Sequence, residues 1–62
     1  MKRTNFYLNL VNNHLTKKIK LNYEYGATYV KTESGNETLF CGTEKQVYYY
    51  LVGVERLLNE QK

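Results

Sequence analysis

The sequence predicts a small α+β domain, in which an antiparallel β-meander of three to four strands packs on one face against a C-terminal α-helix. Two observations carry this prediction. Apolar and polar residues alternate over 17–25, as in a half-buried strand, and an apolar stripe recurs at helical spacing over 43–60. A chain of 62 residues suffices for one domain, 1–62, with a small core.

Residues 5–11 fit two kinds of secondary structure. Every second residue from Phe6 to Leu10 is apolar, as in a strand. Asparagine is a poor helix former that favours turns, and the segment is rich in asparagine, so we favour a strand over 5–11. The alternative is a helix over 5–15, because Leu8, Val11, Leu15 and Ile19 are also spaced like a helical stripe.

Three further strands are expected at about 17–25, 27–33 and 37–41. Gly26 marks a tight turn or a bulge after the first of them, and a Ser-Gly-Asn sequence at 34–36 marks the turn before the last. The strand at 17–25 shows the clearest alternation. Its core-facing residues are expected to be Ile19, Leu21, Tyr23 and Tyr25.

A helix is expected at about 43–60. Thr43 is a good N-cap, and Gln46 three residues later completes the pattern of a capping box. Because one helix covers one face of a sheet, the other face is expected to stay open. The expected core joins Val47, Tyr50, Leu51, Val54 and Leu58 to Phe6, Leu8, Leu10, Ile19, Leu21 and Tyr23.

The composition predicts a cytoplasmic protein. The apolar run over 47–52 is too short to span a bilayer, and the N-terminal segment lacks the apolar stretch of a secretory signal. Seven Tyr, seven Asn and seven Lys, with no Asp, Pro or Trp, are typical of an AT-rich genome and fit a phage or mobile element. The net charge of +3 mildly favours polyanionic partners.

The titratable residues predict a protein that is not an enzyme. His14 lies in an expected turn with no adjacent acid to orient it, and Cys41 is expected to be a buried thiol at the end of a strand. The glycines form neither a phosphate loop nor a dinucleotide fingerprint. We therefore expect no cofactor, no bound metal and no small-molecule substrate.

A second patch is expected on the helix, opposite its core stripe. At about 100° per residue, exposed aromatic and aliphatic side chains fall beside a glycine and an arginine. Protein interfaces favour tyrosine and arginine, and a glycine allows a partner backbone to approach closely. The patch predicts a protein partner or self-association as a homodimer, as in a small regulator or inhibitor. Its residues are Tyr48, Tyr49, Val52, Gly53 and Arg56.

The open face of the sheet supports the alternative function, which is nucleic-acid binding. Aromatic rings interleaved with lysines on a sheet can stack bases and contact phosphates. Lysines on a sheet face also serve simply to keep it soluble, so protein binding remains the leading hypothesis. The candidate nucleic-acid contacts are Tyr7, Lys18, Lys20, Tyr29 and Lys31.

Overall fold

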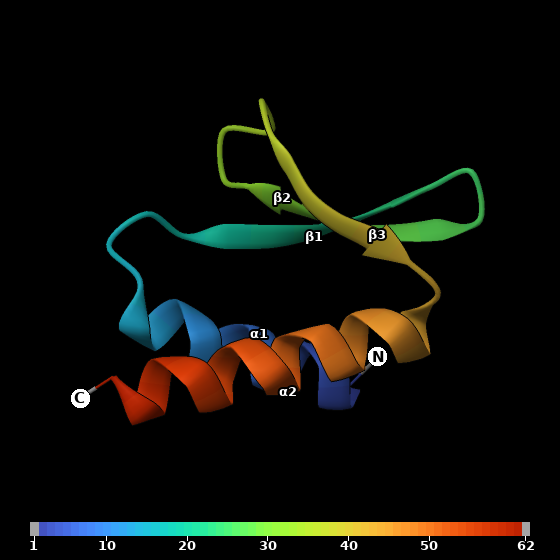
Figure 1. The fold of residues 1–62 in the computed structure, drawn as a ribbon. Helices are drawn as coiled ribbons and strands as arrows, with labels where there is room; N and C mark the ends of the chain where they lie inside the picture. The colour runs from blue at the N-terminus through green and yellow to red at the C-terminus, as the bar shows by residue number, and fades with distance from the viewer. Residues whose placement is uncertain (1, 62) are drawn as a thin grey trace.

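The computed structural model describes residues 2–61 and shows a two-layer α+β fold (Figure 1). Its elements in chain order are α1 (Lys2–His14), β1 (Ile19–Glu24), β2 (Ala27–Thr32), β3 (Thr38–Gly42) and α2 (Glu44–Glu60). The strands form one antiparallel sheet in the order β1-β2-β3. The predicted class, a small meander packed on one face by the C-terminal helix, is confirmed, and the meander has three strands.

The prediction of a strand over 5–11 is wrong, because this segment lies within helix α1. Thr4 and Val11 are buried at helical spacing, with Leu8 and Leu15 packed beside them. The burial of this stripe outweighs the low helix propensity of the asparagines, since tertiary packing supplies most of the stability of a helix. The helical alternative for 5–15 is therefore the correct one.

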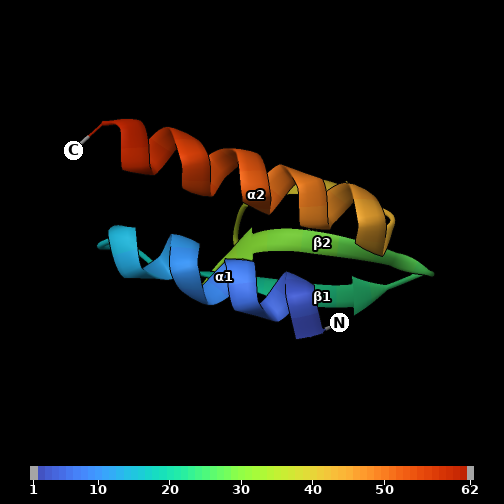
Figure 2. The same cartoon turned by 90° about the horizontal axis from the view of Figure 1, so that it is seen from below.

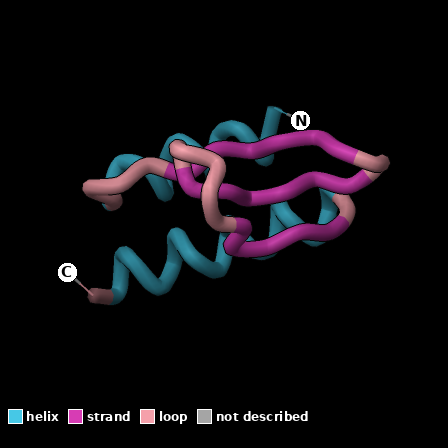
Figure 3. The backbone as a smooth tube through the Cα atoms, turned by 90° about the horizontal axis from the view of Figure 1, so that it is seen from above, coloured by secondary structure: helices cyan, strands magenta, loops and turns pink. Residues whose placement is uncertain are grey.

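The two helices lie side by side on the same face of the sheet (Figure 2). Helix α1 packs against β1 and α2, and helix α2 also packs against β2 and β3. Both helices run in the same direction, so their first turns lie together at one end of the molecule (Figures 1 and 2). The opposite face of the sheet is left uncovered, as expected (Figure 3).

The junction between α1 and β1 is held by two polar side chains. The Asn12 amide donates from Nδ2 to the carbonyl of Ile19 at 3.0 Å, and its Oδ1 accepts the Ile19 N–H at 2.9 Å. The Lys18 ammonium donates to the carbonyls of Asn12 and Leu15, each at 2.7 Å. A cation is favourable at this position, because carbonyl groups at a helix C-terminus lack partners within the helix.

A tight turn at Tyr25 and Gly26 joins β1 to β2. Both residues have positive φ, 52° and 75°, in the left-handed region that glycine adopts readily and tyrosine does not. The strand therefore ends at Glu24, and Tyr25, which was expected on the core face, is 97% exposed in the turn. Consecutive positive φ values are typical of a two-residue hairpin turn.

The core contains most of the predicted residues, either buried or packed against the buried cluster. Its fully buried aliphatic residues come from both helices and from the central strand, and Ile19 on β1 adds to them. Phe6 and Tyr23 were expected in the core, but they are 58% and 57% exposed. Phe6 turns outward because 5–11 is a helix, and Tyr23 lies beside the hairpin turn at the end of the sheet. The core cluster consists of Val11, Ile19, Val30, Val47 and Leu51.

Helix α2 begins as the sequence predicts. The Thr43 side chain accepts the Gln46 N–H, and the Gln46 side chain accepts the Thr43 N–H, which completes a capping box. The core residues Val47 and Leu51 follow on its inner face. This local signal fixes the residue at which the helix begins, and therefore which residues lie on its outer face.

Candidate functional site

Four aromatic rings form a continuous row across the helical layer. Phe6 and Tyr7 lie on α1, and Tyr48 and Tyr49 lie on α2. Successive ring centroids are 5.6, 5.5 and 5.4 Å apart, with interplanar angles of 88°, 88° and 67°. The central rings of Tyr7 and Tyr48 are half-buried, whereas Phe6 and Tyr49 at the ends are 58% and 61% exposed. We call these four residues the aromatic row.

The residues predicted to contact a protein partner lie on α2 along one continuous strip. Tyr49, Gly53 and Arg56 are exposed, and Tyr48 and Val52 are half-buried. Tyr48 contacts Tyr7 of α1, and Val52 follows Tyr48 one turn later on the same side of the helix. The structure therefore brings the predicted patch together and extends it onto α1 through the aromatic row.

Gly53 has no packing role within the described chain. Beyond the adjacent backbone of its own helix, a Cβ atom added at this position would meet no described atom within 4 Å. The backbone does not need a glycine there, because the residue is helical. Glycine inside a helix costs about 1 kcal/mol relative to alanine. The fold itself therefore gives no reason for a glycine in the middle of α2.

A shallow pocket of about 300 Å³ lies beside the aromatic row, where the two helices begin. Thr4 on its lining is buried, and the basic residues Arg3 and Lys45 are exposed. Tyr48 and Tyr49 belong to both the pocket and the aromatic row. The pocket is lined by Arg3, Thr4, Glu44, Lys45, Tyr48 and Tyr49.

The charges at the helix starts are mainly basic. The first turn of α1 contains Lys2 and Arg3 and no acidic residue, and the first turn of α2 contains Lys45 beside Glu44. A cation near a helix N-terminus is unfavourable by about 0.3–1 kcal/mol, because the helix dipole is positive there. Arg3 and Lys45 form no ion pair within residues 2–61. Positive potential is therefore concentrated at one end of the helical layer.

The open sheet face carries three of the five residues predicted to contact nucleic acid. Lys20 on β1 is the cross-strand neighbour of Lys31 on β2, and Tyr29 lies two residues before Lys31 on the same face. The Lys31 ammonium lies 5.5 Å from the centroid of the Tyr29 ring. Lys20, Tyr29 and Lys31 are thus brought together.

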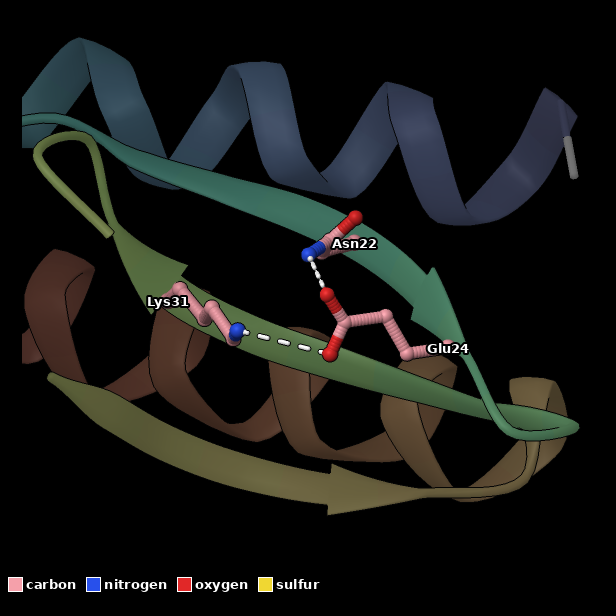
Figure 4. A network of polar contacts seen from close by, with 3 residues as sticks. All are labelled: Asn22, Glu24 and Lys31. Atoms are coloured by element: carbon pink, nitrogen blue, oxygen red, sulfur yellow. Dashed lines mark hydrogen bonds and ion pairs between the residues drawn. The ribbon is translucent and has the colours of Figure 1, made fainter. Parts of the chain in front are cut away.

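An acidic residue partly neutralises this cluster. The Glu24 Oε2 atom lies 3.7 Å from the Lys31 Nζ atom, while its Oε1 atom accepts a hydrogen bond of 2.9 Å from Asn22 (Figure 4). All three side chains lie on the uncovered face of the sheet (Figure 4). Lys20 is consequently the cation on this face that has no ion pair within the described residues.

The other two predicted nucleic-acid contacts lie elsewhere. Tyr7 belongs to α1, on the covered side of the sheet, and packs against the core. Lys18 precedes β1, and its ammonium donates to the carbonyls of Asn12 in α1 and of Leu15 just after it. Both placements follow from the helical conformation of residues 2–14, which the preferred strand over 5–11 did not anticipate.

The remaining residues considered for catalysis or metal binding do not lie together. Cys41 was expected to be buried, but it is exposed, because it pairs with Tyr29 on the open face and not on the helix-facing side. His14 ends α1 instead of lying in a turn. Within residues 2–61, His, Cys and Glu side chains form no group of three that could hold a metal ion. Neither α1 nor α2 is long and apolar enough to cross a membrane.

A second pocket, of about 580 Å³, lies between the loop after α1 and the turn between β2 and β3. Its lining mixes hydroxyl, amide, ammonium and carboxylate groups, and it contains no aromatic ring. Of the ten residues predicted to contact a partner, Lys18 contributes to this lining. Its other residues are Thr16, Lys17, Thr32, Glu33, Ser34, Asn36 and Glu37.

Sequence reasoning missed Phe6, Arg3 and Lys45 as parts of the helical surface. Phe6 was placed in the core of an expected strand. At 100° per residue, Phe6 lies about 160° from Thr4 and about 140° from Val11 on a helical wheel, so the helical alternative would have placed it outside. The positions of Arg3 and Lys45 depend on the parallel pairing of α1 and α2, which no local pattern signals.

Comparison of the chain with protein-family models, with curated proteins and with solved structures finds no match.

Proposed function

We propose that this chain is a small, non-catalytic protein-interaction module whose contact surface is the outer side of the helical layer. The surface comprises the aromatic row together with Val52, Gly53 and Arg56. The module would act as a regulator or inhibitor of a larger partner, or by self-association. Its residue usage fits a cytoplasmic accessory protein of a phage or mobile element.

The observation that carries the proposal is the exposure of the aromatic row. Two large rings, Phe6 and Tyr49, stay mostly in solvent although the core is small and buries few large side chains. The rings between them hold the row in place, because Tyr7 and Tyr48 are half-buried and in edge-to-face contact. Rigid aromatic groups with solvent-exposed area are typical of the residues that dominate binding at protein interfaces.

Gly53 adds independent support. The fold gives no reason for this glycine, and it lies one turn after Tyr49 on the exposed side of α2. A glycine at such a position lets a partner backbone approach the helix more closely than any other residue would. Arg56, also exposed, lies next to it and can bind carboxylate or carbonyl groups of a partner.

The proposal is tested by two linked measurements on purified protein. Sedimentation equilibrium of the free chain shows whether it self-associates. Tagged wild type, Tyr49→Ala and Gly53→Leu are then compared as baits in an extract of the organism that makes the protein. Lys20→Glu, on the opposite face, is the control.

We expect the wild type either to self-associate or to retain a specific protein. Tyr49→Ala and Gly53→Leu should lose this interaction, and Lys20→Glu should keep it. A monomer whose retained proteins are the same for all four baits would contradict it. Circular dichroism of each variant ensures that the loss does not reflect unfolding.

Nucleic-acid binding is the second candidate, and the pairing of Lys20 with Lys31 beside Tyr29 favours it. It predicts binding of single-stranded DNA that weakens steeply as salt rises, because phosphate contacts release counterions. Lys20→Glu should abolish that binding, whereas Lys17→Glu, in the loop before β1, should weaken it less. Equal affinity of wild type and Lys20→Glu would remove the sheet as the site.

A further inference from the structure

We infer that the partner surface recognised by the helical layer is an acidic protein segment with an apolar side chain beside its carboxylates. This inference rests on the proposed function and specifies the chemistry of the partner. Its carboxylates would meet Arg3 and Lys45, and its apolar side chain would lie against Tyr48 and Tyr49.

The placement of charge at the helix starts favours an acidic ligand. Arg3 and Lys45 occupy the first turns of two parallel helices, where the helix dipoles already favour an anion. Neither cation is neutralised by an ion pair within residues 2–61. The two cations therefore lower the stability of the free protein slightly, and an acidic ligand would remove this cost.

Charged and aromatic side chains adjoin in one pocket. Arg3 and Lys45 line the same pocket as Tyr48 and Tyr49, together with Thr4 and the acidic Glu44. A segment only a few residues long could therefore place a carboxylate at the helix starts and an apolar side chain against the rings. Arginine binds carboxylates through two parallel hydrogen bonds, which gives such a contact direction as well as strength.

The geometry of the rings favours a protein side chain over nucleic-acid bases. Nucleic-acid bases stack on the flat faces of aromatic side chains. In the aromatic row, each ring stands steeply to the next, at 88°, 88° and 67°, so the edge of one ring meets the face of its neighbour. Such a row offers no series of parallel faces for successive bases. It suits an aliphatic or aromatic protein side chain better than a polynucleotide.

A random peptide library displayed on phage tests this inference with the full-length protein as bait. The peptides enriched on wild type are sequenced, and the strongest is synthesised and its affinity measured by calorimetry. The same peptide is then titrated into Tyr49→Ala, into the double variant Arg3→Glu/Lys45→Glu, and into the charge-matched control Lys17→Glu/Lys20→Glu.

The double variant is expected to fold at least as well as wild type, because a glutamate in the first turn of a helix is favoured by the dipole. We expect the enriched peptides to combine Asp or Glu with Phe, Leu or Trp. Their affinity should fall at least about tenfold in Arg3→Glu/Lys45→Glu, and much less in the control, because only the former reverses charges beside the row. Thermal unfolding of each variant verifies folding.

Other outcomes separate this inference from the proposed function. The enriched peptides could depend on Tyr49 and yet show no excess of acidic residues, or they could bind both double variants equally. Either result would contradict an acidic partner but would still support the helical layer as the contact surface. A library that yields no peptide dependent on Tyr49 would count against both. Salt-sensitive binding of oligothymidine that is lost in Arg3→Glu/Lys45→Glu would overturn the inference in favour of a nucleic acid.

Discussion

The ring of Tyr7 on α1 meets the ring of Tyr48 on α2 edge to face, with centroids 5.5 Å apart and planes at 88°. This contact joins the two helices and forms the centre of the aromatic row. It therefore links the stability of the helical layer to the surface proposed to bind a partner. The contact exists only because residues 2–14 are helical.

Replacement of either ring at this contact should show energetic coupling. Edge-to-face aromatic pairs contribute about 1 kcal/mol beyond the area they bury. In a double-mutant cycle of Tyr7→Leu and Tyr48→Leu, measured by urea unfolding, the coupling free energy should be of this order. Strictly additive effects of the two substitutions would show that the rings do not interact in solution.

Asn12 should be important for the stability of the fold. Its amide makes two hydrogen bonds with the Ile19 backbone and so holds the end of α1 against β1. Asn12→Ala leaves both backbone groups without this partner, and we expect the free energy of unfolding to fall by about 2 kcal/mol. The adjacent Asn13→Ala, at an exposed position, is the control and should change stability by less than about 0.5 kcal/mol. Equal losses of stability in the two variants would contradict the role of the Asn12 amide in joining α1 to β1.

Thr28 should be replaceable by valine with a gain in stability. Its side chain is fully buried between β1 and β3, and its hydroxyl has no hydrogen-bond partner among the described residues. Valine has nearly the same shape and needs no partner, so Thr28→Val should raise the free energy of unfolding by about 1 kcal/mol. A loss of stability in urea titrations would reveal a hydrogen bond that the hydroxyl makes in solution.

Gly53→Ala should also stabilise the free protein. There is space for the methyl group, and alanine is favoured over glycine in a helix by about 1 kcal/mol. The gain is measured by urea unfolding of the isolated chain. If Gly53→Ala were destabilising instead, the glycine would have a role within the fold, and it would no longer indicate a partner.

The sequence was a good guide where a signal was local. The capping box at Thr43 and the apolar stripe from Val47 correctly predicted helix α2, and the alternation around Ile19 predicted β1. The positions of the β2 and β3 strands followed from the turns that flank them. Each of these signals lies within a few residues of the element it defines.

The first segment was predicted wrongly because its two patterns compete. Phe6, Leu8 and Leu10 alternate as in a strand, yet Val11 is buried as part of a helical stripe. The helix is stabilised mainly by the packing of this stripe against β1 and α2. Local helix propensity gives no information about that packing. The same error placed Tyr7 on the sheet and Phe6 in the core, and it hid the aromatic row.

Site-specific photo-crosslinking tests the central claim most directly. A benzophenone amino acid is placed at Tyr49 in one variant and at Lys20, on the opposite face, in another, and each is irradiated in the cells that make the protein. We predict a discrete crosslinked protein species from position 49, either a second copy or a partner, and none from position 20. A species formed from position 20 alone, or formed equally from both positions, would contradict the helical layer as the contact surface.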